Sequence, residues 1–366
     1  MVQHFLNGAR ASRLGCALLV LCAVALLPSL TVAAKQKTEV EPPPPELLLE
    51  GGRKLSFERS ISSQRDVRGK LGFWKKLVNV VAGEPEYKQL ARPYDVAVDS
   101  RGRLIVSDPG ARGVHIFDIA QNKYKFLERQ DKVKDPMLEP QCLAVDAKDN
   151  IYVTDSKAGK IFVFDSNGKY RGVLGSLKGG EGLFKRPTGI AVDDETQNIY
   201  VTDTLRDRIF VLDSKGQVLR TIGQRGGENG EFNYPAEVLF KDGILAVVDA
   251  MNFRIQLFDR NGTFLSAIGN PGDSSGELFR PKGIGLDSEG HIYLVEGLWG
   301  VVQVFDREGR LLYNFGKRGT KLGEFQLPAG LFIDRTDRVY VVDSYNRRIQ
   351  VFQYHGLSGR PGGANQ

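Results

Sequence analysis

The chain has 366 residues, of which 41% are hydrophobic and 26% charged, a composition typical of a folded globular protein and not of a disordered chain. Its formal net charge of +6 is small for this length, which argues against a nucleic-acid partner. Forty-two glycines indicate many turns and few long helices.

The first 34 residues predict an export signal. Arg10 and Arg13 precede the apolar run CALLVLCAVALLPSL at 16–30, and small residues follow in TVAA. A basic start, about 7–15 apolar residues and a small-residue end describe a signal peptide, and the run is shorter than the about 20 residues of a membrane span. We expect cleavage near Ala34 and a periplasmic or extracellular protein. The alternative is an uncleaved leader that anchors the chain to the membrane.

Cleavage would leave one cysteine in the chain. Cys16 and Cys22 lie in the leader, so Cys142 has no partner for an internal disulfide. We therefore expect the hydrophobic core to stabilise the exported protein without covalent links. Export also makes an encounter with nucleic acid improbable.

Two segments follow the leader. Residues 35–52 contain EPPPPE and predict an extended, stiff linker. The next stretch, GRKLSFERSIS, is similar to the segment GRLLYNFG near residue 310, and we assign a strand within residues 53–66 to it.

The link at 67–90 contains FWKKLVNVVAG. Its apolar residues follow helical spacing, which predicts a short amphipathic helix over 71–82 with Gly83 at its end. The same segment is the alternative source of the strand assigned to 53–66.

A short phrase then returns six times. It reads IYVTDS, IYVTDT and VYVVDS in its clearest copies. The steps between its final acidic residues are 47, 48, 46, 47 and 47 residues, and the acids are Asp108, Asp155, Asp203, Asp249, Glu296 and Asp343. A regular period of 20–50 residues indicates a repeat architecture.

Each repeat contains four short segments rich in β-branched and aromatic residues, separated by polar turns. In the third repeat they are TGIAVD, NIYVTD, RIFVLD and GQVLRTIG. Such segments predict strands, and six units of four strands predict an all-β, six-bladed β-propeller over residues 91–356. The last repeat ends at RIQVFQYHG without a fourth strand, so we expect the N-terminal strand to close the ring. Residues 357–366 predict a flexible tail.

The organisation resembles the NHL-repeat family of six-bladed propellers over about residues 90–355. The similarity rests on the segments from Phe184 to Asp193 and from Phe279 to Asp287, on the YVxD phrases, and on NxRIQ[VL]F, which occurs twice. The leader with its prolines and predicted helix also resembles exported bacterial members. The resemblance implies the fold but leaves function open, because the family includes scaffolds, RNA binders and an amidating lyase.

Large side chains gather in the loops of one predicted face. In propellers the fourth-to-first and second-to-third connections lie together, here called the top face, and the remaining turns form the bottom face. The top loops are long, and loops on a rigid scaffold are common binding sites. The alternative is that several of these side chains pack between blades. The candidate partner-binding residues are Arg92, Arg186, Arg206, Met251, Asn252, Phe253, Arg280, Glu296, Leu298, Trp299, Tyr345 and Arg347.

Two carboxylates are expected at the centre of the ring. The residues two past the proline that starts each repeat are Asp95, Cys142, Gly189, Glu237, Gly283 and Gly330. Asp95 and Glu237 belong to opposite blades, and two facing carboxylates can bind Ca²⁺ or act as acid and base. The alternative is salt bridges with the nearby Arg92, Arg186, Arg280 or Lys282. Cys142 is expected to be a small buried residue.

Glu296 is the exception among the phrase-ending acids. The aspartates are expected to cap the following turn and to pair with a cation five residues later, at Lys160, Arg208, Arg254 or Arg348. In the fifth repeat the pair is Glu296 and Val301. Either Glu296 points into a specialised contact loop, or the change has no functional meaning.

These observations favour a binding protein over an enzyme. The four histidines do not converge, and the chain lacks CxxC, GxSxG and Walker motifs. We expect a monomeric, cofactor-free propeller that binds a protein or glycan of the cell envelope through its top face. One alternative is a Ca²⁺-dependent hydrolase or lactonase-like enzyme with Asp95, Glu237 and Asn252 as ligands. The other is a structural envelope component tethered by its leader, its only membrane contact.

Overall fold

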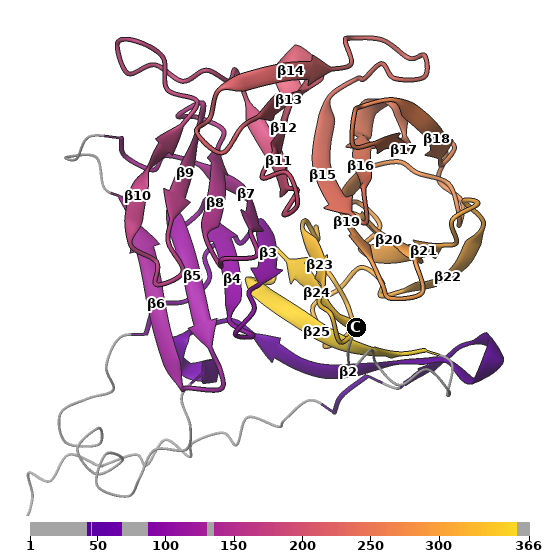
Figure 1. The fold of residues 1–366 in the computed structure, drawn as a ribbon. Helices are drawn as coiled ribbons and strands as arrows, with labels where there is room; N and C mark the ends of the chain where they lie inside the picture. Colours follow the sequence, from indigo (N-terminus) through magenta and orange to yellow (C-terminus); the bar gives the residue numbers. More distant parts are fainter. Residues whose placement is uncertain (1–41, 45, 68–86, 130–134, 357–366) are drawn as a thin grey trace, which may run out of the picture. The chain divides into compact units, whose positions relative to one another are not determined.

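The computed structural model of the protein describes residues 42–44, 46–67, 87–129 and 135–356. These residues form six antiparallel sheets, which confirms the expected six-bladed β-propeller (Figure 1). The first strands of the six blades contact one another in a closed circle, from β3 through β7, β11, β15, β19 and β23 back to β3. The helix predicted over 71–82 lies outside the described residues.

The first five blades each contain four strands that follow one another from the inside of the ring outward. Blades one and two comprise β3 (Asp95–Val98), β4 (Leu104–Asp108), β5 (Gly113–Asp118), β6 (Lys123–Glu128), β7 (Pro140–Val145), β8 (Ile151–Asp155), β9 (Lys160–Phe164) and β10 (Tyr170–Leu174). Blades three to five comprise β11 (Pro187–Val192), β12 (Ile199–Asp203), β13 (Arg208–Leu212), β14 (Val218–Ile222), β15 (Pro235–Lys241), β16 (Ile244–Asp249), β17 (Arg254–Asp259), β18 (Phe264–Ile268), β19 (Pro281–Leu286), β20 (Ile292–Glu296), β21 (Val301–Phe305) and β22 (Leu311–Phe315).

The recurring phrase is the second strand of each blade. All five residues of β8, β12 and β20 are buried, because each blade is stacked between two neighbours and both faces of its sheet are covered. The outer strands differ, and β14 exposes most of its side chains. Burial on both sides explains why the same apolar phrase is needed in every repeat.

The sixth blade is built from both ends of the chain. It contains β23 (Leu331–Ile333), β24 (Arg338–Asp343) and β25 (Arg348–His355), and then β2 (Lys54–Ile61) and β1 (Leu47–Leu48). Figure 1 shows β2 running beside β25, and the two strands pair from Lys54↔His355 to Ile61↔Ile349. This pairing confirms the expected closure of the ring by an N-terminal strand.

Helical structure in the described residues is limited to four short 3₁₀ turns: η1 (Glu50–Gly52), η2 (Gln64–Val67), η3 (Thr204–Arg206) and η4 (Ala250–Asn252). Within these described ranges, no helix reaches the length and apolar character needed to cross a bilayer.

Buried side chains hold the loops that connect successive blades on the top face. In the loop before blade four, Phe232 is fully buried. Gln256 of β17 accepts a bond from the Gly230 N–H at 2.9 Å and donates to the Glu231 carbonyl at 2.7 Å. Gln303 and Gln350 brace the next two loops in the same way. The long loops are therefore fixed to the blades beneath them.

We expect the closing strand to contribute strongly to stability. Ile61 of β2 is 2% exposed and packs in the core between blades six and one. Ile61→Ala should lower the free energy of unfolding by about 2–5 kcal/mol, because it leaves a cavity, as measured by urea denaturation. Leu48→Ala, at a side chain 77% exposed, is the control and should change it by less than about 0.5 kcal/mol. Equal effects of the two substitutions would contradict a structural role for β2.

Candidate functional site

The acid that ends each second strand accepts backbone N–H groups from the two residues before the proline of its own blade, here called the lead-in residues. It binds both of them in blades one, two, three and five, and the first of them in blades four and six. Asp203 accepts the N–H groups of Lys185 and Arg186 at 2.8 and 2.9 Å. Asp108 accepts those of Ala91 and Arg92 at 2.6 and 3.0 Å. The acids therefore fix the backbone from which the top-face side chains project.

Glu296 accepts the equivalent bonds in blade five. This contradicts the alternative that it points into a contact loop, and with it the choice of Glu296 as a partner-binding residue. It is fully buried, and its two carboxylate oxygens accept the N–H groups of Phe279 and Arg280 at 3.2 and 2.9 Å. Burial raises the pKa of Glu296, while these two bonds lower it. Glu296 is not accessible to a partner.

Among the described residues, the predicted ion pairs of these acids form in blades four and six only. Arg254 pairs with Asp249 at 2.9 Å and Arg348 with Asp343 at 2.6 Å. The predictions for Lys160 and Arg208 were wrong. The Lys160 ammonium contacts Asp135 at 2.8 Å, and Arg208 donates to the carbonyl of Arg206 at 3.2 Å.

Arg206 and Asn252 are engaged within the protein. Arg206 lies 3.2 Å from Asp203 and donates to the Leu183 carbonyl at 2.7 Å, although its side chain is exposed. The Asn252 amide donates to the Gly226 carbonyl and to Asp249, both at 2.8 Å. Asn252 therefore braces a loop, and its amide is not directed to Asp95 or Glu237 as a third metal ligand.

Exposed apolar side chains form an arc across blades four and five of the top face. We call this set the apolar arc: the exposed Tyr234, Met251, Phe279 and Trp299, together with the half-buried Phe253. Phe253 and Phe279 stack with ring centroids 6.4 Å apart, and Phe279 and Trp299 are also 6.4 Å apart. Met251 is 52% and Trp299 45% exposed. Leu298 is half-buried beside them, and Tyr345 and Arg347 are exposed on the equivalent turn of blade six.

The other exposed large apolar side chains are scattered. They lie on outer strands, as do Val218, Leu219, Leu265 and Leu312, on β1, or singly in top loops. In the part of the chain that the structure describes, none of them lies in a bottom-face turn. The apolar arc is therefore a local concentration on one face.

Three acidic groups converge at the centre of the ring. Asp95, Cys142 and Glu237, here called the central cluster, each bring one ligand atom to within 4.8 Å of the others. The Cys142 thiol donates to Glu237 at 2.9 Å, and Asp95 accepts the N–H of Leu143 at 2.9 Å. The sequence pointed to the two carboxylates but not to a role for the thiol, although Cys142 occupies the equivalent position in its blade.

Glycines at the other central positions make room for these acids. A Cβ on Gly330 would lie 2.3 Å from Asp95 Oδ1, and one on Gly189 would lie 2.8 Å from the Cα of Glu237. Both distances are too short for real contacts, so small residues are required where the first strands crowd together. The mixture of glycines and acids follows from this crowding.

The salt bridges offered as an alternative for the central carboxylates do not form. Within the described ranges, no lysine, arginine or histidine lies within 4.0 Å of a carboxylate oxygen of Asp95 or Glu237. Burial raises the pKa of Asp95 to about 7. Burial and the nearby charge of Asp95 raise the pKa of Glu237 to about 8. Burial also raises the pKa of Cys142, so without a cation the central cluster holds protons near neutral pH.

The described histidines lie apart from one another. His115 is buried on β5 and contacts the Tyr124 hydroxyl at 2.8 Å. His291 pairs with Asp287 at 2.8 Å in a bottom-face turn, and His355 ends β25. These positions agree with the expectation that the histidines do not converge.

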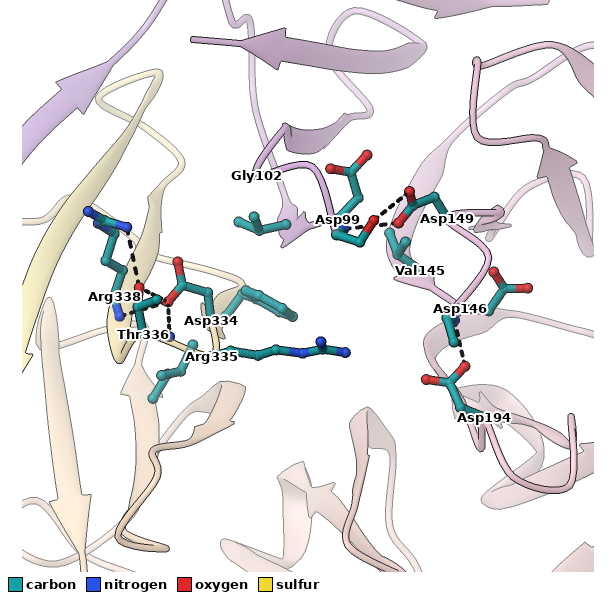
Figure 2. A pocket seen from close by; sticks show the side chains of 15 residues that line it. Asp99, Gly102, Val145, Asp146, Asp149, Asp194, Asp334, Arg335, Thr336 and Arg338 are labelled. Atoms are coloured by element: carbon teal, nitrogen blue, oxygen red, sulfur yellow. Dashed lines mark hydrogen bonds between the residues drawn. The ribbon is translucent and has the colours of Figure 1, made fainter. Parts of the chain in front are cut away.

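The bottom face has a cavity that the sequence did not indicate. It has a volume of about 380 Å³ and is lined mainly by the first-to-second turns of blades one, two and six. Figure 2 shows the Arg335 side chain extending into it. Its acids are already bonded: Asp149 accepts the Ser100 hydroxyl at 2.8 Å, and Asp194 accepts the Ala147 N–H at 2.7 Å (Figure 2). These bonds join the turns of adjacent blades.

The central carboxylates should make stability depend on pH. Their pKa values are raised above ordinary carboxyl values, so between about pH 4 and 8 the folded chain binds more protons than the unfolded chain. The contribution of these two carboxylates to the free energy of unfolding is therefore greatest at low pH, and it falls as the pH rises through their raised pKa values. The free energy of unfolding of the chelator-treated wild type should fall between pH 5 and 8. In the double variant Asp95→Asn/Glu237→Gln this fall should be smaller by at least about 1.4 kcal/mol, as measured by urea denaturation.

Glu308→Gln, at an exposed carboxylate, is the control for that experiment and should leave the pH dependence as in the wild type. A double variant with the wild-type pH dependence would show that the central carboxylates are not destabilised by burial.

Comparisons with known proteins agree with the structure. A family model described as a six-bladed β-propeller matches residues 140–222 and 227–300, and one described as an NHL repeat matches residues 325–352. No curated protein matches the sequence.

Several solved structures are similar. A protein of unknown function from Bacteroides thetaiotaomicron is 14% identical, with a TM-score of 0.58 over 85% of this chain and 84% of that one. A gluconolactonase from Xanthomonas campestris is 16% identical, with a TM-score of 0.56 over 86% and 99%. A streptogramin B lyase is 17% identical, with a TM-score of 0.54 over 72% and 94%. At these identities the similarity shows the fold alone. By its structure and the two family models, the chain is a six-bladed β-propeller that contains an NHL repeat.

Proposed function

We propose that the protein is an exported, non-catalytic binding propeller that engages a protein or glycan of the cell envelope through its top face. The observation that carries this proposal is the apolar arc. Aromatic residues and methionine are enriched at protein interfaces, and contiguous apolar side chains exposed on one face of a folded protein mark binding sites.

The backbone beneath the arc is fixed before any partner arrives. The Met251 N–H donates to the Asn233 carbonyl at 3.0 Å, and the Gly297 N–H donates to the Arg280 carbonyl at 3.1 Å. Together with the bond from Phe279 to Glu296, these contacts tie each turn to the lead-in residues beside it. A surface that is already ordered loses less conformational entropy on binding.

A second candidate function rests on the central cluster. Two carboxylates and a thiol that converge to within 4.8 Å are a possible metal site. Calcium prefers six to eight oxygen ligands, whereas thiolate, carboxylate and water suit zinc. The donor set therefore favours zinc over the calcium expected from the carboxylates alone. A zinc ion held there would lower the pKa of a bound water, as a metal-dependent hydrolase requires.

Removal of an arc side chain should weaken binding. Peptides selected on the purified protein from a random phage-displayed library, and sugars that bind it on a glycan array, are the probes. Trp299→Ala should weaken binding of the selected probes at least tenfold, because truncation of an interface aromatic commonly has an effect of about 2 kcal/mol or more, measured by biolayer interferometry.

The matched control for Trp299 is Leu312→Ala. Leu312 is also 45% exposed, but it lies on the outer strand β22. If Leu312→Ala weakened the selected probes as much as Trp299→Ala, or if no probe were selected, the top face would not be the binding site.

The metal candidate predicts stoichiometric zinc binding. Calorimetric titration of chelator-treated protein should show one Zn²⁺ site that binds more tightly than Ca²⁺. Cys142→Ser and Glu237→Gln should each weaken it at least tenfold, because removal of supporting groups around a metal already weakens binding about 10–100-fold. Zinc binding that survives both substitutions would place any metal outside the central cluster.

A further inference from the structure

The lead-in residues place three arginines around the ring axis on the top face. We call Arg92, Arg186 and Arg280 the cationic rim; each directly precedes the proline of an alternate blade, and each is exposed. Their N–H groups are held by Asp108, Asp203 and Glu296, as described above. The backbone of the rim residues is thus held by the same kind of hydrogen bond as the backbone of the apolar arc.

The charges of the rim are not neutralised within the protein. In the described part of the chain, the guanidinium groups of Arg92, Arg186 and Arg280 form no ion pair and no hydrogen bond. For a single exposed arginine the lack of a partner has little energetic cost, because water solvates its charge. Three such guanidinium groups around one axis, however, together produce a positive electrostatic potential.

Lys282 adds a fourth cation below the rim. Its ammonium lies 5.9 Å from the ring centroid of Tyr94, and Gly297 leaves the space for it, since a Cβ there would lie 3.1 Å from Lys282 Cε. Burial lowers the pKa of Lys282, and the charge of Arg280 lowers it further. The ammonium of Lys282 therefore lies close enough to Arg280 for the two charges to interact.

Few acids lie in the lead-in residues and second-to-third turns. The acids that end the second strands are already bound to the backbone. Apart from them, the described lead-in residues and second-to-third turns contain two acids, Glu139 and Asp207. Glu139 accepts the Ser156 hydroxyl at 3.0 Å, and Asp207 is buried and accepts the Tyr234 N–H at 2.9 Å. The same turns add exposed cations at Lys157, Lys185 and Arg347.

The apolar arc and the cationic rim meet within one blade. Phe279 of the arc and Arg280 of the rim are consecutive residues, and both are exposed. The backbone beside Phe279 therefore carries a guanidinium that has no partner in the described residues. Guanidinium groups bind carboxylates through two parallel hydrogen bonds, which makes arginine well suited to acidic groups.

We infer that the partner, on the function proposed above, is a protein segment in which acidic side chains stand beside apolar ones. Its apolar side chains cover the arc and its carboxylates lie at the rim. Met251 favours a protein over a sugar here, because a flexible thioether adapts to irregular apolar side chains. Charge complementarity of this kind speeds association and selects among partners.

Two phage-displayed peptide libraries test this inference on the purified protein. Both have randomised apolar positions, and the intervening positions are fixed as Glu in one library and as Gln in the other. We expect the Glu library to yield binders whose synthetic versions bind at least tenfold more tightly than their Gln counterparts in fluorescence polarisation. Their affinity should fall as salt rises from about 50 to 300 mM, because screening weakens exposed charge pairs.

Arg186→Gln/Arg280→Gln should weaken the Glu peptides at least tenfold and flatten the salt dependence. The matched control is Arg307→Gln/Arg335→Gln, which removes two exposed arginines from bottom-face turns and should leave binding unchanged. Trp299→Ala should weaken Glu and Gln peptides alike. An oligogalacturonate and a single-stranded RNA serve as anionic probes without apolar side chains and should bind more weakly than the Glu peptides.

Equal affinity of Glu and Gln peptides, unaffected by the rim substitutions but weakened by Trp299→Ala, would overturn the inference and leave the proposed function standing. Tighter binding of the oligogalacturonate or of the RNA would also overturn it, in favour of an anionic glycan or a nucleic acid. If neither Trp299→Ala nor the rim substitutions changed the affinity of the selected peptides, the proposed function would be overturned as well.

Discussion

The top face depends on one recurring interaction, the buried carboxylate that ends each second strand and accepts backbone N–H groups from the lead-in residues. A buried carboxylate is costly unless it is hydrogen-bonded. Here each oxygen can receive an N–H, as in Asp203 and Glu296. Since the lead-in residues start the innermost strand, the same bonds connect the ring axis to the surface. The apolar arc and the cationic rim are both carried by backbone fixed in this way.

The fold could be predicted from the sequence because burial imposes a pattern that repeats. A second strand covered on both faces needs an apolar phrase in every blade, and the period of the phrase gives the number of blades. The missing fourth strand of the last repeat likewise required an N-terminal strand, and its apolar residues, such as Leu55 and Ile61, are buried in the structure. These features depend on local composition and on counting, and both can be read from one chain.

The site was less predictable because it depends on side-chain reach. Glutamate is one methylene longer than aspartate, yet Glu296 makes the bonds of the aspartates it replaces, and the sequence could not show that the backbone adapts. Lys160 found Asp135 instead of the acid five residues before it, because the long ammonium side chain extends to another loop. Cys142 joined two carboxylates from other blades. Such contacts are set by distances across the ring, which sequence spacing does not encode.

The closing strand has a consequence for how the protein is made. Ser56 of β2 contacts His355 of β25 although the two residues are 299 positions apart in the chain, and contacts between residues so distant in sequence form slowly. During synthesis β2 follows only β1, and its edge that pairs with β25 has no partner until the last blade has been completed. Any nascent or C-terminally truncated chain therefore exposes the unpaired edge of β2, the kind of edge that promotes aggregation. Closure of the ring therefore requires both β2 and β25.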